Sequence, residues 1–374
     1  MQGGPLYRIQ QRLGLIPRRG LGISRRMIFF TLLTWVPIMV WAIVNERVFL
    51  GVVTEPLLQH FGVHVRCLVA IPLLITAEAV AQAISRRIFP CFVTSGLVTE
   101  DMIPRFVEIL RQAVRLRDSW VAAAMMVVLA VLLAWRFMGA DGALHEDTLS
   151  WAISGESGLP RMGFGGWWFL FVVRPVFIFF LLHWVWKLFV AAVVFWRIAH
   201  LDLRLVPLHP DRVGGLGFLE QAPFAFSLVI LAISSVVASH WAHQILYHDA
   251  HVTSFIPQLA LFMAIIVVIF LGPLLLFSPQ LGQLKRRSLL TYGSLVTEHC
   301  RLVHKRWIVG ESVENEVVLD ATELGAVTDP VWMYEAVARI RMAPLSNRSL
   351  LAVVVPALLP IILVFAIEAV VLYM

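Results

Sequence analysis

The sequence SLLAVVVPALLPIILVFAIEAVVL, residues 349–372, contains a single charged side chain, Glu368. A helix needs about 20 predominantly apolar residues to cross the hydrocarbon core of a bilayer, so this stretch predicts a transmembrane helix. Working outward along the chain, further runs of this kind occur at residues 27–44, 63–84, 119–138, 167–195, 223–246 and 257–279. The sequence therefore predicts an all-α fold, a polytopic membrane protein with seven transmembrane helices.

The overall composition excludes a soluble globular protein. Hydrophobic residues make up 59% of the chain, the mean hydropathy is +0.82 and only 14% of the residues are charged. Cys67, Cys91 and Cys300 stand apart without a C-x-x-C spacing, so neither a disulfide framework nor a thiolate metal site is indicated. The net charge of +6 comes without a basic stripe interleaved with aromatic residues. We expect no nucleic-acid partner and no cofactor.

The distribution of Lys and Arg predicts the orientation. With the N-terminus in the cytoplasm, 24 of the 30 basic residues fall in the inner segments, which are 1–26, 85–118, 197–222 and 280–348. The outer segments hold only Arg47, Arg66 and Arg161. Because basic residues that flank membrane spans collect on the cytoplasmic side, we predict a bacterial inner-membrane, multi-pass protein with its C-terminus outside. The basic inner face is expected to contact membrane lipids, above all anionic lipid.

The same division gives the domain organisation. Residues 27–279 hold the first six spans, residues 280–348 form a cytoplasmic helical segment, and residues 349–374 hold the last span. The basic N-terminal segment 1–26 and the connections 85–118 and 197–222 are cytoplasmic. In the connection 85–118, an amphipathic helix is expected, because apolar side chains recur at helical spacing at Ile103, Phe106, Val107, Leu110 and Val114.

The cytoplasmic segment 280–348 is expected to contain two helices. The first continues span six well beyond the membrane. The second is expected to start at Thr328, where Asp329 can cap the helix and Pro330 suits its first position, and to stop before Pro344.

One polar segment carries a resemblance to a known family. Residues 208–219, LHPDRVGGLGFL, resemble the signature of a family of uncharacterised bacterial multi-pass inner-membrane proteins. The resemblance extends over most of the chain, including RIRMAPLS at 339–346, but implies no activity. In topology alone, the chain is also similar to the seven-span insect chemoreceptor-like ion channel superfamily. This second similarity implies a channel without assigning a role to any residue.

The signature segment is itself a candidate site. Its glycines allow a tight turn or the close approach of a ligand, while its polar side chains can bind an anionic headgroup or gate a passage. The alternative is a purely structural turn that Asp211 caps. The residues of this cytoplasmic turn motif are His209, Asp211, Arg212, Gly214, Gly215 and Gly217.

Four histidines gather at the outer end of the fifth span. His240, His243, His248 and His251 would lie on one side of a continued helix. Clustered imidazoles can bind zinc or copper or respond to pH. Histidines at the membrane boundary can equally serve as ordinary amphipathic residues, so metal binding stays one of two interpretations.

Charged residues inside the predicted spans are the most informative, because each costs about 2.5–3.5 kcal/mol at a helix centre on insertion scales. Glu78 and Lys187 lie at a similar depth, which predicts an ion pair, with His183 one turn from Lys187. A second pair is expected between Glu368 and either Arg174 or Arg136. The alternative to buried pairs is a water-filled path that some of these residues line.

The last span suggests a conduction path. Pro356 and Pro360 lie four residues apart, which is expected to bend the helix and free backbone carbonyls that a water-filled lumen can satisfy. In this hypothesis Glu368 forms an outer carboxylate ring. An apolar constriction is formed by Val353, Val354 and Leu358.

No catalytic signature of a known hydrolase or metalloenzyme occurs in the sequence. We therefore expect an ion channel, cation-conducting and homo-oligomeric, with the last helix lining the pore. The alternative is a membrane transporter, or an intramembrane enzyme or metal-binding protein, that uses its polar residues within one protomer.

Overall fold

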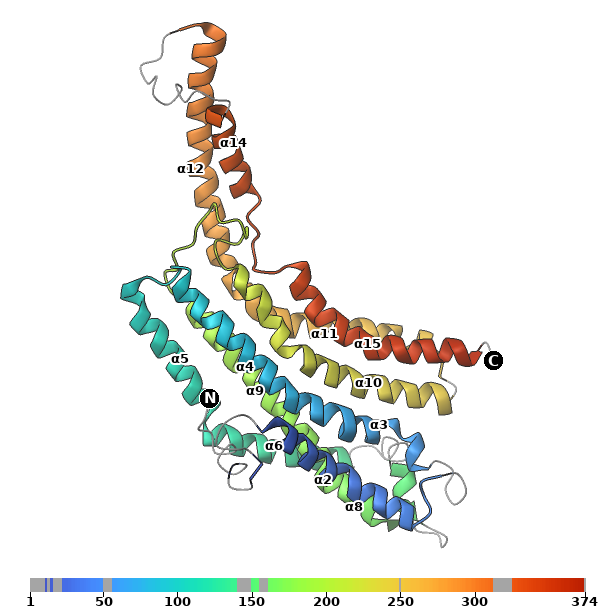
Figure 1. Ribbon diagram of the computed structural model, residues 1–374. Coiled ribbons are helices and arrows are strands. Elements are labelled where there is room, and N and C mark those ends of the chain that lie inside the picture. Colours follow the sequence, from blue (N-terminus) through green and yellow to red (C-terminus); the bar gives the residue numbers. More distant parts are fainter. Residues whose placement is uncertain are drawn as a thin grey trace.

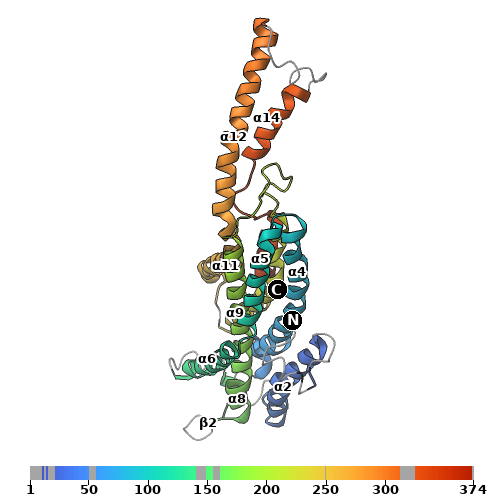
Figure 2. The same cartoon turned by 90° about the vertical axis from the view of Figure 1, so that its left-hand side faces the viewer.

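The computed structural model describes residues 11, 14–15, 22–49, 56–139, 149–154, 161–248, 250–311 and 325–372. These residues form an almost entirely helical molecule in which a bundle of long helices carries a narrow projection at one end (Figures 1 and 2). The described residues include seven helical stretches that are long and apolar enough to cross a membrane. The fold is therefore that of a multi-pass membrane protein, as the sequence predicts.

The first half of the chain alternates α-helices with short 3₁₀ and π turns. The elements are α2 (Ile23–Val44), η1 (Leu57–Gln59), α3 (Phe61–His64), η2 (Val65–Ala70), α4 (Ile71–Thr94), η3 (Glu100–Met102), α5 (Ile103–Arg117), α6 (Trp120–Gly139), η4 (Ser150–Ala152), α8 (Phe164–Trp168), η5 (Phe169–Val173) and α9 (Arg174–Ile198). The two-residue strands β1 (Ile153–Ser154) and β2 (Arg161–Met162) pair antiparallel.

The second half contains the projection and the last span. Its elements are η6 (Gly217–Phe226), α10 (Ser227–Tyr247), η7 (Val252–Phe255), α11 (Ile256–Leu271), η8 (Gly272–Phe277), α12 (Ser278–His304), η9 (Lys305–Val309), α14 (Gly325–Ala338) and α15 (Asn347–Leu372). We call the projection formed by α12, η9 and α14 the arm, and the adjoining end of the bundle the arm end (Figure 1).

Several of the spanning stretches are much longer than a bilayer requires. The stretch Phe61–Thr94 has 34 residues and Phe164–Ile198 has 35, or about 50 Å each at 1.5 Å per residue. The hydrocarbon core is only about 30 Å thick, so these helices extend beyond it. The apolar runs in the sequence were shorter because the helical backbone continues through polar turns that contain Arg86, Arg87 and Arg197.

The amphipathic helix α5 runs alongside α9 at the arm end (Figure 1). Phe106 is buried and its ring lies 5.6 Å from that of Phe92. Two other residues expected on the apolar face, Val107 and Val114, are exposed instead. The face that packs inward is shifted around the helix, with Ala113 and other side chains against the core.

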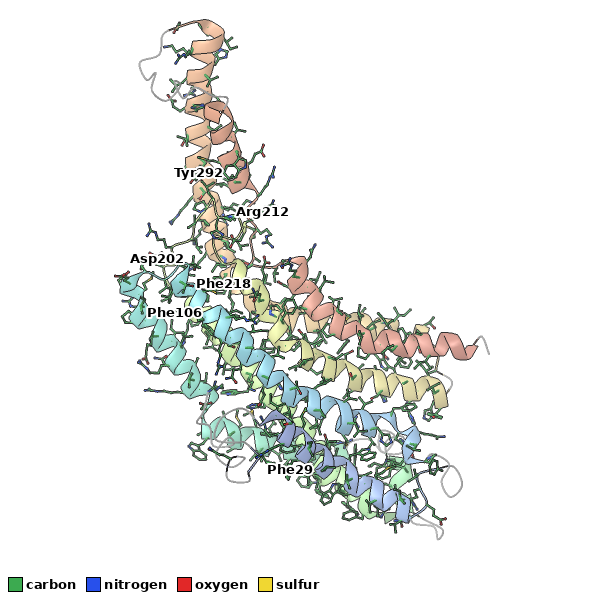
Figure 3. The ribbon with its side chains drawn as sticks, in the orientation of Figure 1. Phe29, Phe106, Asp202, Arg212, Phe218 and Tyr292 are labelled. Atoms are coloured by element: carbon green, nitrogen blue, oxygen red, sulfur yellow. The ribbon has the colours of Figure 1, made fainter. Side chains whose placement is uncertain are left out.

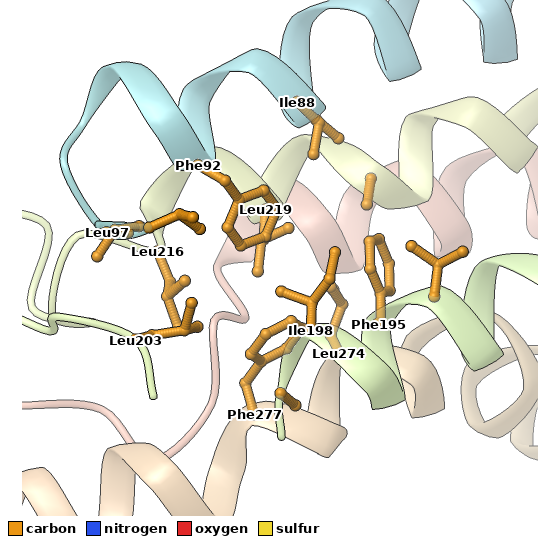
Figure 4. Packing of buried hydrophobic residues seen from close by; sticks show 14 of the residues in the cluster. Ile88, Phe92, Leu97, Phe195, Ile198, Leu203, Leu216, Leu219, Leu274 and Phe277 are labelled. Carbon is orange, nitrogen blue, oxygen red and sulfur yellow. The ribbon is translucent and has the colours of Figure 1, made fainter. Parts of the chain in front are cut away.

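A hydrophobic core joins the elements of the arm end (Figure 4). Phe92 of α4, Ile198 of α9, Leu219 of η6 and Phe277 of η8 are almost fully buried in it. These elements lie far apart in the sequence. The core therefore fixes how α4, α9 and the base of α12 sit relative to one another.

The arm departs from the bundle at η8. Here Gly272 and Pro273 interrupt the helical ladder, and α11 and α12 run in different directions (Figure 1). α14 packs along α12, with Tyr334 close to Gly293. It begins at Gly325, three residues before the start expected at Thr328, and ends at Ala338, before Pro344.

Candidate functional site

The charged residues expected inside the bundle gather around one carboxylate. Glu78 of α4 accepts from Lys187 of α9 at 3.2 Å and from Arg26 of α2 at 2.5 Å. The Nε2 atom of His183 lies 3.6 Å from the same carboxylate. Three helices thus contribute to one cluster, which we call the Glu78 cluster: Arg26, Glu78, His183 and Lys187.

Neighbouring side chains hold the cluster in place. The ammonium of Lys187 lies 4.3 Å from the centre of the Trp184 ring, a cation–π contact, and the Trp184 indole donates to the Leu74 carbonyl at 2.9 Å. The stem of Arg26 is deeply buried, with 4% of the residue exposed. These contacts hold Lys187 and Arg26 in place beside Glu78.

The sequence predicted only part of this cluster. Glu78, Lys187 and His183 come together as expected from their depth in the spans. The apolar run begins at residue 27, so the sequence alone places Arg26 in the basic N-terminal segment. α2 in fact begins at Ile23, which places Arg26 in its first turn and its side chain inside the bundle.

The Glu78 cluster lines a cavity of about 620 Å³. The cavity lies between α4, α9, η6 and the α5–α6 pair, and α2 contributes only Arg26. Most of its lining side chains are apolar. Four basic and two acidic side chains also line it: Arg26, Arg86, Arg117, Lys187, Glu78 and Asp118.

Three buried polar atoms on the cavity lining have no hydrogen-bond partner among the described residues. They are Nε of Arg26, Oε1 of Gln82 and Nδ1 of His183. A buried polar group without a partner costs about 1–3 kcal/mol, so such groups normally find water or a ligand. Their presence distinguishes this cavity from a simple packing defect.

The second predicted pair joins Glu368 to Arg174 or Arg136. The side chains of Glu368 and Arg136 lie outside the part of the chain that the structure describes. Arg174, at the start of α9, lies with its guanidinium 6.0 Å from the centre of the Phe169 ring, and Arg66 approaches the same ring at 5.8 Å. α15, which carries Glu368, packs chiefly against α10, and also against η6 and α11.

The three residues of the predicted constriction in the last span differ in their burial. Val353 is fully buried among residues of the bundle. The Ser234 hydroxyl of α10 donates to the carbonyl of Ala357 at 2.5 Å. α15 curves along its length, and Val354, Pro356, Leu358 and Pro360 are half-buried (Figure 1).

The signature turn is built around Asp211. Its carboxylate accepts from the backbone N–H groups of Gly217 at 2.7 Å, Val213 at 2.9 Å and Gly215 at 3.2 Å. His209 Nδ1 lies 2.8 Å from the same carboxylate. These contacts fit the structural interpretation, in which Asp211 caps the turn.

The backbone of the turn requires its glycines. Gly214 and Gly215 have φ of +66° and +98°, and a Cβ on Gly217 would lie 2.9 Å from the Cβ of Asp211. Arg212, which Figure 3 labels at the base of the arm, also adopts a left-handed φ of +59°. The cost of that conformation is offset by the contacts that the turn makes.

Arg341, from the second segment of the family resemblance, links the turn to η6 and to the segment that precedes α15. Its guanidinium donates to the Asp211 carbonyl at 2.9 Å and to Glu220 at 2.6 Å, and also contacts the Leu345 carbonyl. Its backbone N–H donates to the Arg212 carbonyl at 2.8 Å. The segments 208–219 and 339–346 therefore form one structural unit at the base of the arm.

This environment sets the acidity of Asp211. Burial alone would raise the pKa of Asp211, but the N–H groups of Val213, Gly217 and Gly215 and the His209 imidazole outweigh burial. The pKa of Asp211 is therefore held below its ordinary value of 3.8. The carboxylate is ionised at neutral pH, which strengthens its hydrogen bonds to the turn.

The predicted histidine cluster is only partly assembled. His243 is buried, its ring centre lies 5.2 Å from that of His248, and its Nδ1 lies 3.0 Å from the Gln59 carbonyl. His240 and His251 are exposed. His60, which the sequence analysis missed, lies with its ring 5.0 Å from His243. The described residues include no group of three or more His, Cys, Asp or Glu side chains placed to hold a metal ion.

Comparisons with known proteins do not add to this geometry. No family model, no curated protein and no solved structure matches the chain. The resemblance of residues 208–219 to a family signature therefore stays a prediction.

Proposed function

We propose that the chain is a membrane transporter whose solute site is the cavity lined by the Glu78 cluster, within one protomer. The observation that supports this most is the combination of a charged cluster and a cavity of about 620 Å³ inside the bundle. Ionisable residues inside a membrane domain are costly and typically mark the path of a substrate or ion. Ligand sites commonly combine apolar walls with a few convergent polar groups.

The proposed orientation places the arm in the cytoplasm of a bacterium and the end of α15 outside its inner membrane. The asymmetry of Lys and Arg supports this assignment, since nine of the 30 basic residues fall in segment 280–348, which holds the arm. The solute site would then lie toward the cytoplasmic side of the bundle, because Arg26 is in the first turn of α2.

A transporter must open its site to each side of the membrane in turn. In a background with Cys67→Ala, Cys91→Ser and Cys300→Ser, we expect Ala191→Cys on the cavity lining to react with a membrane-impermeant thiol reagent from both sides. Reaction is measured in right-side-out and inside-out vesicles. Labelling from one side only, or from neither, would contradict transport through this cavity.

Two controls accompany this measurement. Val128→Cys, on the exposed apolar surface of α6 and away from the cavity lining, is expected to stay unlabelled because lipid excludes the reagent. The chain that retains only the exposed Cys300 of the arm is expected to react from the cytoplasmic side alone. Labelling of Cys300 in intact cells would overturn the proposed orientation.

A channel between copies of the chain is the second proposal. It is favoured by the outer face of α15, where a row of large apolar side chains is exposed: Leu351, Val355, Leu359, Ile362 and Leu363. In an oligomer this face, with Glu368 further along the helix, would line a cation path in place of Val353. A monomeric particle in lipid would remove this proposal.

A further inference from the structure

We propose that the occupant of the cavity is an anionic phospholipid, with its phosphate at Arg26 and Lys187 and an acyl chain along the apolar walls. This inference rests on the proposed function, because it names the class of solute for the same cavity. It follows from the charge around the cavity, the polar atoms left over by the Glu78 cluster, and the chemistry of the walls.

The charge around the cavity favours an anion. The lining contains four basic and two acidic side chains. Arg117 is neutralised by Asp118, to which it donates two hydrogen bonds of 2.8 Å. Glu78 accepts from both Arg26 and Lys187 and can balance only one of them. Arg86 is exposed on the lining and has no carboxylate partner among the described residues. An excess of positive charge therefore remains.

The Glu78 cluster also has unused donors. Arg26 is only 4% exposed, and its buried Nε donates to no described residue. The ammonium of Lys187 has three N–H groups, of which one donates to Glu78. A phosphate oxygen is a strong acceptor that can satisfy both side chains through charge-assisted hydrogen bonds.

The walls distinguish an amphiphile from a small anion. Beyond the charged groups, the lining is formed by side chains that offer a long acyl chain an apolar surface: Ile88, Phe89, Phe180, Val190, Val194 and Phe226. A free phosphate ion would leave this surface exposed to water. A phospholipid from the surrounding bilayer fits both parts of the cavity.

The test compares three probes on the purified full chain in detergent by native mass spectrometry: phosphatidylglycerol, phosphatidylcholine and inorganic phosphate. We expect phosphatidylglycerol to bind at least about tenfold more tightly than phosphatidylcholine, and inorganic phosphate to bind weakly. Ala191→Trp, which fills the cavity without changing its charges, is expected to weaken phosphatidylglycerol binding at least about tenfold. Ala192→Trp is the matched control, since Ala192 does not line the cavity.

Each alternative outcome contradicts a defined part of the proposal. Equal binding of the two lipids would exclude charge recognition, and tight binding of inorganic phosphate would exclude a role for the acyl chain. Equal binding by Ala191→Trp and Ala192→Trp would exclude the cavity. If the cavity is labelled from both sides but phosphatidylglycerol is not preferred, only the solute class is wrong. If phosphatidylglycerol binds but labelling is one-sided, transport is wrong and the lipid site stands.

Discussion

Replacing Glu78 with glutamine is expected to lower the free energy of unfolding by about 3–5 kcal/mol, because it leaves Arg26 and Lys187 together without a counter-charge. Their surroundings make this costly: the side chains of Arg26 and Lys187 are only 5% and 20% exposed. Equilibrium unfolding of the purified chain in mixed detergent micelles containing dodecyl sulfate measures the change.

The matched control is Glu335→Gln on α14, which breaks an exposed pair with Arg339. Exposed pairs contribute little, so we expect a change within about 0.5 kcal/mol. Adding Lys187→Met to Glu78→Gln removes one of the uncompensated charges and is expected to restore part of the lost stability. If Glu78→Gln and Glu335→Gln had the same effect, the Glu78 cluster would not be a buried charge network.

Replacing Asp211 with alanine is expected to lower the free energy of unfolding by about 2–3 kcal/mol. The substitution removes the acceptor for three backbone N–H groups, those of Val213, Gly215 and Gly217, in a turn that cannot rearrange easily around its left-handed residues. Asp202→Ala, at an exposed position of the same connection, is the control and is expected to have no measurable effect.

The stability that Asp211 contributes is also expected to depend on pH. Because the pKa of Asp211 is lower in the folded chain than its ordinary value of 3.8, its contribution is present above that value. The contribution is lost as the pH falls through the lower, folded-state pKa. The difference in stability between the parent chain and Asp211→Ala should therefore be constant near neutrality and shrink below about pH 4. A difference that stayed constant in acid would contradict this role of the carboxylate.

The sequence predicted where the spanning helices lie, because that depends on the length and hydropathy of apolar runs. It did not predict which face of each helix packs inward. Apolar runs located all seven spanning stretches, since length and hydropathy decide that question. In contrast, α15 is apolar on every side, so its sequence carries no signal for the face that packs inward. The burial of Val353 inside the bundle therefore could not be read from the sequence.

The candidate site shows the same division. Glu78 and Lys187 could be paired from their depth in two spans, because a charge inside an apolar helix needs a partner. The apolar run alone could not identify Arg26 as a member of the cluster, because the run begins after it. A basic residue just before an apolar run is nevertheless a signal that can be sought in other sequences. His60 and His243 lie far apart in the chain, and only the fold brings their rings together.

The most direct test of the cavity as a solute site is an electron cryo-microscopy structure of the purified chain in lipid nanodiscs that contain phosphatidylglycerol. We predict non-protein density between α4, α9 and the α5–α6 pair, with its headgroup next to Arg26 and Lys187. If the particle contains several copies of the chain, this density is expected inside each copy and not between copies. A cavity closed by protein side chains, or one that contains only water next to the Glu78 cluster, would contradict the account.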